Sequence, residues 1–153
     1  MTETTLPSIL ELVPHSGAMS LLDRVIAVEG ERLSAEVVVP ADGLFSHDGG
    51  VGAWVGIEYM AQAVAAWAGW QSRQLGEAPR IGLLLGTRRY RCSLPRFAAG
   101  QTLQVDIERG YQADNGLGQF ECRIHADGTE LASATLTVFG PKDPSAFLNG
   151  ETV

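Results

Sequence analysis

The stretch AWVGIEYMAQAVAAWAGWQSRQL, residues 53–75, decides the fold of this protein. It contains no proline and is rich in alanine. Apolar residues occupy nearly every side of its helical projection, namely Trp54, Val55, Ile57, Met60, Val64, Trp67 and Trp70. A helix that is apolar all round has to be buried all round. The stretch therefore predicts one long helix in the centre of the molecule.

A membrane span is the competing explanation, because residues 51–70 are about as long as a helix that crosses a bilayer. The stretch also holds Glu58, Gln62 and several glycines, and its ends lack a basic anchor. We therefore expect a buried helix and no membrane association. The first residues, MTETTLPSILELVPHSG, lack the features of a secretory signal, which favours a cytoplasmic location.

Runs in which apolar and polar residues alternate lie on both sides of the helix and predict about six strands. The predicted strands span residues 19–28, 31–39, 81–92, 103–108, 120–124 and 132–138. Turn sequences at Glu29-Gly30, Asp114-Asn115-Gly116 and Asp127-Gly128 favour antiparallel connections. One apolar helix and such a sheet can pack only if the sheet curls around the helix. This is the α+β hotdog fold.

The chain has 153 residues, of which 45% are hydrophobic and 19% charged, so we expect a single hotdog domain over residues 1–153. Its ends, residues 1–10 and 141–153, should be loosely held. A single curled sheet leaves an edge strand unpaired and the helix partly uncovered. Dimerisation through sheet edges and helices is therefore expected.

The net charge of −7 argues against nucleic-acid binding. Six of the eleven basic residues are arginines between positions 73 and 96, where Glu77 is the single acid. This strip is either a solvated face or a docking surface for an acidic or phosphorylated partner. The two cysteines, Cys92 and Cys122, lack the spacing of metal ligands, so we interpret them as core or strand residues and predict no metal site.

Glu58 is the first candidate for a catalytic residue, because it is the one charge in the helix before Arg73. Burial would favour its neutral form, which can donate a proton as a general acid. Gln62 follows one turn later on the same face, where its amide could orient the carboxyl or a substrate. The alternative is a structural carboxyl that is satisfied by backbone or by a partner subunit.

The segment GGVGAWVG, residues 49–56, exposes backbone amides at the start of the helix. Such amides can hold a thioester carbonyl, although the glycines could equally serve close packing of the helix. Histidines are available as a general base at His15, before the first strand, and at His47, eleven residues before Glu58. His125 falls on an exposed strand face and is expected to lie at the surface.

Three segments resemble the beta-hydroxyacyl-acyl-carrier-protein dehydratases of the hotdog superfamily, and more closely the dehydratase-like branch of aryl polyene biosynthesis clusters. They are LVPHSGAMSLLDRV, GAWVGIEYMAQAVAAWAGW and GLLLGTRRYRCSLPRFAAGQTL, at residues 12–25, 52–70 and 82–103. The resemblance covers roughly residues 12–140. It implies loss of water from a 3-hydroxyacyl thioester on acyl carrier protein, giving the trans-2-enoyl product, with no cofactor beyond the carrier's phosphopantetheine.

By this resemblance Glu58 takes the place of the catalytic carboxylate, and Gly52 and Ala53 take the place of the carbonyl-binding amides. The common dehydratases have Pro-Gly there. Their histidine lies fourteen residues before the carboxylate, whereas His47 lies at eleven. The histidine of the opening Pro-His motif, which recurs in the aryl polyene branch, is His15.

The resemblance slightly favours His15 as the base and keeps His47 as its rival. The phosphopantetheine arm would pass Arg88 or Arg89, with the arginine strip facing the acidic carrier. The expected assembly is a homodimer, or a heterodimer with a related hotdog subunit. Two other functions stay open, a hotdog acyl-thioesterase and a catalytically silent partner subunit of a heterodimeric dehydratase.

Overall fold

The computed structural model describes residues 20–76, 83–113 and 115–139, with the backbone alone for residues 83–85. The ends that we expected to be loose, residues 1–10 and 141–153, lie outside this part. In chain order the described elements are β1 (Arg24–Glu29), β2 (Arg32–Val38), β3 (Ser46–His47), β4 (Gly50–Gly52), α2 (Val55–Gln74), β5 (Leu83–Cys92), β6 (Arg96–Ala98), β7 (Thr102–Gln112), β8 (Leu117–Ala126) and β9 (Thr129–Phe139).

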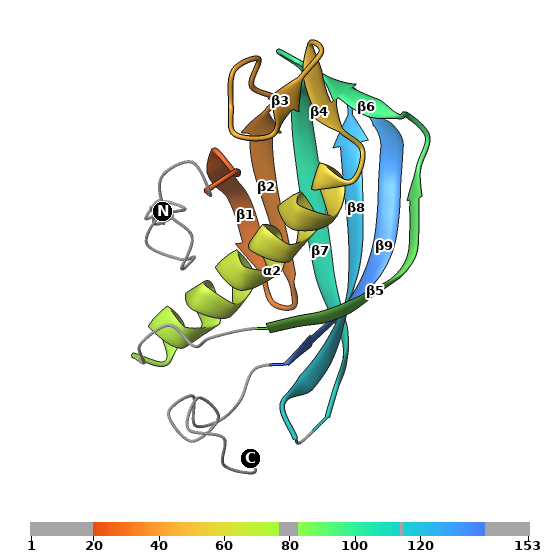
Figure 1. Cartoon of the computed structure of the whole chain (residues 1–153). Helices are drawn as coiled ribbons and strands as arrows, with labels where there is room; N and C mark the ends of the chain where they lie inside the picture. The colour runs from red at the N-terminus through yellow and green to blue at the C-terminus, as the bar shows by residue number, and fades with distance from the viewer. Residues whose placement is uncertain (1–19, 77–82, 114, 140–153) are drawn as a thin grey trace.

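Six strands form one antiparallel sheet in the order β1-β2-β7-β8-β9-β5, and the sheet curls around α2 (Figure 1). Its register aligns Ala35 with Val105, Val105 with Ile124, and Ile124 with Ala132. All four side chains are buried against the helix side of the sheet. The apolar positions of four strands coincide in one row, and a shift of any strand by one residue would turn its apolar side chains to the other face. The predicted α+β hotdog fold is confirmed.

The helix is buried along the side that faces the sheet, where Tyr59, Met60 and Ala63 are at most 1% exposed. The opposite side is only partly covered in the single chain. Trp54 is 60% exposed, and a stripe of apolar side chains is half-buried, namely Ile57, Ala61, Ala65 and Ala68. The single curled sheet therefore covers one side of the helix and leaves the other partly open, as the sequence analysis expected.

A second, three-stranded sheet of β3, β4 and β6 was not predicted. Residues 44–52 and 95–100 lie outside the six strands that the sequence predicts. These strands have two or three residues each, too few to show an alternating pattern. Gly50 lets β4 approach β6, since a Cβ at this position would overlap the Phe97 carbonyl. The sheet closes over the start of α2 (Figure 1).

Within the described ranges, no helix is both long enough and apolar enough to cross a membrane.

Candidate active site

Glu58 lies in the first turn of α2, on the border between its buried and its open side. Its carboxyl is half-buried, which corrects the expectation of a fully sequestered acid. Gln62 is fully buried one turn later, and its Nε2 donates a hydrogen bond of 3.2 Å to Glu58 Oε1. The sequence placed these two side chains on one face, and the structure brings them into contact. Gln62 therefore orients the carboxyl of Glu58.

A backbone group outside the helix fixes the orientation of the Gln62 amide. Its Oε1 accepts a hydrogen bond of 2.9 Å from the backbone N–H of Leu21. Because the oxygen is used in this way, the NH₂ group is the end that faces Glu58. Gln62 thus joins the carboxyl of Glu58 to the chain segment that leads into β1.

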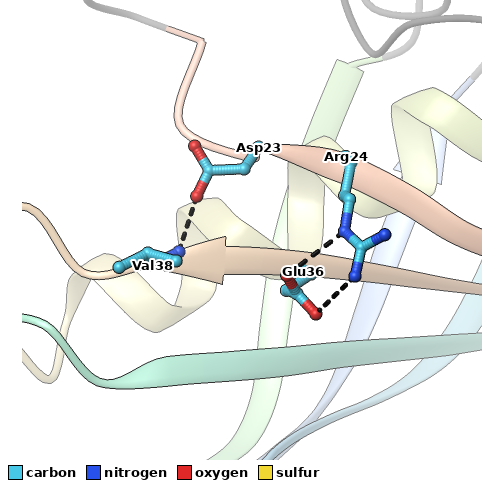
Figure 2. A network of polar contacts seen from close by, with 4 residues as sticks. All are labelled: Asp23, Arg24, Glu36 and Val38. Atoms are coloured by element: carbon cyan, nitrogen blue, oxygen red, sulfur yellow. Dashed lines mark hydrogen bonds and ion pairs between the residues drawn. The ribbon is translucent and has the colours of Figure 1, made fainter.

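This lead-in segment is fastened to β2 by the Asp-Arg pair of the Leu-Leu-Asp-Arg-Val motif (Figure 2). Asp23 Oδ2 accepts a bond of 2.6 Å from the Val38 N–H, and Arg24 makes two bonds of 3.2 Å to Glu36. The motif therefore fixes where the preceding chain meets the helix. His15 precedes it and lies outside the described residues, so its role stays a prediction.

His47 lies at the end of β3, in the hairpin that it forms with β4. Its side chain is 75% exposed, and its Nε2 lies 2.9 Å from Asp48 Oδ2. Arg96 donates to its backbone carbonyl. His47 is therefore held on a solvent-facing hairpin. His125, expected at the surface, is half-buried on β8, where its Nε2 lies 3.0 Å from Asp106 Oδ2.

The start of α2 has no capping side chain. The N–H of Ala53 donates a bond of 3.0 Å to the Pro95 carbonyl, so it is not available to a substrate, contrary to the implied role. The N–H groups of Trp54 and Val55 donate to no backbone carbonyl in the described part of the chain. These two amides are the better candidates to hold a carbonyl oxygen.

Gly52 serves packing at this point. A Cβ there would lie 2.7 Å from Nε1 of the Trp54 indole, which covers the glycine. Of the two explanations that the glycine-rich segment allowed, close packing therefore holds at Gly52. Its part in binding a carbonyl stays a prediction.

A cavity of about 240 Å³ lies beside the first two turns of α2, between the end of β2 and the chain before β3. Val55 and Tyr59 of the helix form one of its walls. Burial and the charge of Asp23 raise the pKa of Tyr59 to about 12, so its hydroxyl stays protonated at neutral pH. The other apolar wall residues are Leu21, Val38, Pro40, Leu44, Phe45 and Val51.

Strand β5 is an edge strand, since its one hydrogen-bonded neighbour in the sheet is β9. It carries three exposed arginines, Arg88, Arg89 and Arg91. None of the three forms an ion pair with a carboxylate of the described residues. The side chain of Arg96, in contrast, donates a hydrogen bond to the backbone carbonyl of His47. The arginine strip of the sequence thus becomes a basic edge.

Both cysteines lie in strands, as predicted: Cys92 is half-buried on β5 and Cys122 is buried on β8. Burial raises the pKa of the Cys122 thiol, so it stays protonated.

Sequence reasoning also missed Tyr90 on β5. Its hydroxyl donates to the Ala53 carbonyl immediately before the helix. No spacing rule connects two positions that lie 37 residues apart, so the sequence held no signal for this contact.

A long helix packed against a curled antiparallel sheet defines a hotdog protein. The model of the ApeP-like family, described as ApeP dehydratase, matches residues 7–149. The chain belongs to this family. The resemblance stated from the sequence is thereby confirmed, and no curated protein matches the chain.

The solved structure titled the dehydratase heterocomplex ApeI:P from Xenorhabdus doucetiae is similar to this chain, with 32% identity and a TM-score of 0.86. The match covers 95% of this chain and 97% of that one. A hypothetical thioesterase with coenzyme A from Streptococcus pneumoniae has 14% identity, a TM-score of 0.59, and coverage of 76% and 84%. The PaaI protein of Escherichia coli has 15% identity, a TM-score of 0.61, and coverage of 80% and 84%. The last two show the fold alone.

Proposed function

We propose that this protein removes water from 3-hydroxyacyl thioesters on acyl carrier protein, giving trans-2-enoyl thioesters, in aryl polyene or fatty-acid-like biosynthesis. The observation that carries the proposal is the carboxyl of Glu58, held by the buried Gln62 at the start of the central helix. Membership of the ApeP-like dehydratase family supports it. The reaction uses side chains, backbone amides and the phosphopantetheine of the carrier.

In this mechanism a histidine removes the proton next to the thioester carbonyl. The carbonyl oxygen then gains negative charge, which the N–H groups of Trp54 and Val55 stabilise together with the positive end of the helix dipole. The electron pair forms the new double bond as the 3-hydroxyl leaves. Glu58 gives its proton to the leaving group, so that water is released. The acyl chain lies in the cavity beside Val55 and Tyr59.

His15 is our proposed base, and His47 is its rival. Leu21 is bonded to Gln62, and His15 is six residues ahead of it, so an extended chain reaches about 20 Å from this anchor. His47 points instead from a hairpin into solvent.

We expect His15→Ala to lower turnover by about 10² to 10⁴, the usual contribution of a general base, and His47→Ala to leave more than half of it. Initial rates of enoyl-thioester formation measure both variants. The opposite ranking would assign the base to His47.

The basic edge of β5 is the proposed docking surface for the carrier, because Arg88 and Arg89 are exposed and unneutralised by described carboxylates. Charge reversal in the variant R88E/R89E should weaken carrier binding by at least about tenfold at low salt. Exposed charges at the edge of an interface attract a partner of opposite charge over a long range. The difference should shrink in high salt.

Titration calorimetry with the acylated carrier measures this effect. Reversal of Arg123, an exposed arginine on β8 that pairs with Glu130, is the matched control and should change affinity little. Equal affinity of R88E/R89E and the natural protein would remove β5 as the docking surface.

We further propose that the protein works as a heterodimer with a related hotdog subunit. The relative in the ApeI:P structure is a heterocomplex, and here the half-buried stripe on α2 is a surface that a second subunit would cover. Such a subunit would also complete the burial of Glu58.

The decisive experiment assays the purified chain alone and together with the related hotdog subunit of its own organism. Reversible absorbance of an enoyl thioester signals dehydration, whereas release of free thiol signals hydrolysis. Dehydration that is lost with Glu58→Gln supports the proposal. Hydrolysis would make the protein a thioesterase, and activity that is indifferent to Glu58 would make it the silent subunit of the pair.

A further inference from the structure

We infer that Tyr90 is a positioning residue that locks the start of α2, and with it Glu58, to the edge strand β5. The inference rests on the proposed role of Glu58 as the general acid. It concerns a residue that does not touch the reacting atoms and acts through the backbone that precedes the helix.

The carbonyl and the N–H of Ala53 both form hydrogen bonds with residues that follow the helix in the chain. Its carbonyl accepts the hydroxyl of Tyr90 and also the N–H of Gly56 at 3.0 Å. Its N–H donates to the Pro95 carbonyl at 3.0 Å. No capping side chain stabilises this helix start, so these contacts replace a cap. They fix the backbone from which Trp54, Val55 and Glu58 follow.

Gly56 provides the space for this lock. A Cβ at position 56 would overlap the Tyr90 hydroxyl, and it would lie 3.2 Å from Ile124 Cδ1 and 3.3 Å from Phe97 Cε2. The hydroxyl therefore reaches the helix start because residue 56 has no side chain. Burial raises the pKa of Tyr90, which keeps this hydroxyl protonated as a donor.

An irregularity of β5 points Tyr90 at the helix. Arg88 pairs with Thr135 and Arg91 with Ser133, so two residues of β5 lie opposite one residue of β9. Arg89, at this bulge, has a φ of 54°, in the left-handed region. Bulges of this kind redirect side chains and are frequent beside active sites. Here the bulge exposes two consecutive arginines and turns the next residue, Tyr90, inward.

Residues 88–90 of β5 thus carry both the arginines that are proposed to contact the carrier and the tyrosine that holds the start of α2. The Tyr90 side chain also interacts with Cys92, which lies two residues later on the same strand. Phenylalanine keeps the ring and removes the hydroxyl alone, so the contribution of this contact to the position of Glu58 can be tested by one substitution.

The test compares Tyr90→Phe with Tyr111→Phe, a control at a 62% exposed tyrosine of β7. In the complex that turns over substrate, Tyr90→Phe should lower kcat by about tenfold or more and leave KM within about twofold, because a small displacement of a catalytic group slows chemistry without weakening binding. Amide hydrogen exchange at residues 56–58, whose N–H groups form the first bonds of the helix, should become faster in Tyr90→Phe. Tyr111→Phe should change neither.

A second pair of variants tests the contact itself. Gly56→Ala should lower the melting temperature strongly in the natural background and much less in Tyr90→Phe, because the overlapping hydroxyl is gone. Unchanged exchange at residues 56–58 in Tyr90→Phe, or additive effects of the two substitutions, would overturn the inference. These readouts need no turnover. If Glu58 proves irrelevant to dehydration while exchange and coupling behave as stated, the proposed function fails and the lock on the helix remains.

Discussion

Replacing Glu58 with glutamine should lower the rate of dehydration by about 10² to 10⁴, because general acid catalysis contributes this much and an amide cannot supply the proton. The side chain keeps its length and shape, so Gln62 retains a neighbour at position 58. The melting temperature should therefore change little. Steady-state rates with a 3-hydroxyacyl carrier substrate measure the effect, and circular dichroism confirms the fold.

A matched control is Glu29→Gln, at an exposed carboxylate that ends β1. It should leave the rate unchanged and show that the loss belongs to position 58 rather than to one negative charge fewer. A Glu58→Gln variant that keeps more than a tenth of the natural rate would remove Glu58 from the role of proton donor.

Truncation of Trp67 should produce the largest loss of stability. The side chain is 6% exposed in the last half of α2, and its ring meets Phe120 edge-to-face with a centroid distance of 5.6 Å. Its Nε1 donates to the Gly30 carbonyl at 2.9 Å, and the Arg109 guanidinium lies 5.2 Å from the ring centre. The indole thus joins the helix to the β1–β2 turn and to the middle of the sheet.

Trp67→Ala should cost about 3 to 5 kcal/mol of unfolding free energy, the usual range for a buried aromatic residue replaced by alanine. Urea titration followed by circular dichroism measures it. The control is Trp54→Ala, because Trp54 directly precedes the same helix but is 60% exposed; it should cost about 1 kcal/mol or less, the value of its contact with Phe45. Similar losses for both tryptophans would contradict our account of which helix face is buried.

The two predictions concern helix residues, Trp67 and Glu58, that the sequence identified for different physical reasons. Trp67 was recognisable as a core residue because an apolar stretch without proline has to pack inside the protein. Glu58 was recognisable as a candidate because burying a carboxylate costs free energy, so a carboxylate in an apolar helix indicates a functional role. Its degree of burial was overestimated, since the sequence does not show which side of the helix the single sheet leaves open.

The contacts of the site residues divide into those that the sequence predicts and those that only the folded structure shows. The contact between Gln62 and Glu58 was predictable, because residues four apart share a helix face. The bond from Leu21 to Gln62 was not, and neither was the engagement of the Ala53 N–H by Pro95. The second of these moved one proposed carbonyl-binding amide from Ala53 to Trp54 and Val55.

The sequence by itself determined the central helix, the six antiparallel strands and the family, because periodicity and local motifs are properties of neighbouring residues. The tertiary structure alone decided how the helix start is held, through the Tyr90 hydroxyl and the small sheet of β3, β4 and β6. The Tyr90 contact joins residues 37 positions apart, and the pairing of β4 with β6 joins Gly50 to Ala98. Their geometry depends on a bulge and on the absence of a side chain at Gly56, which act only once the chain has folded.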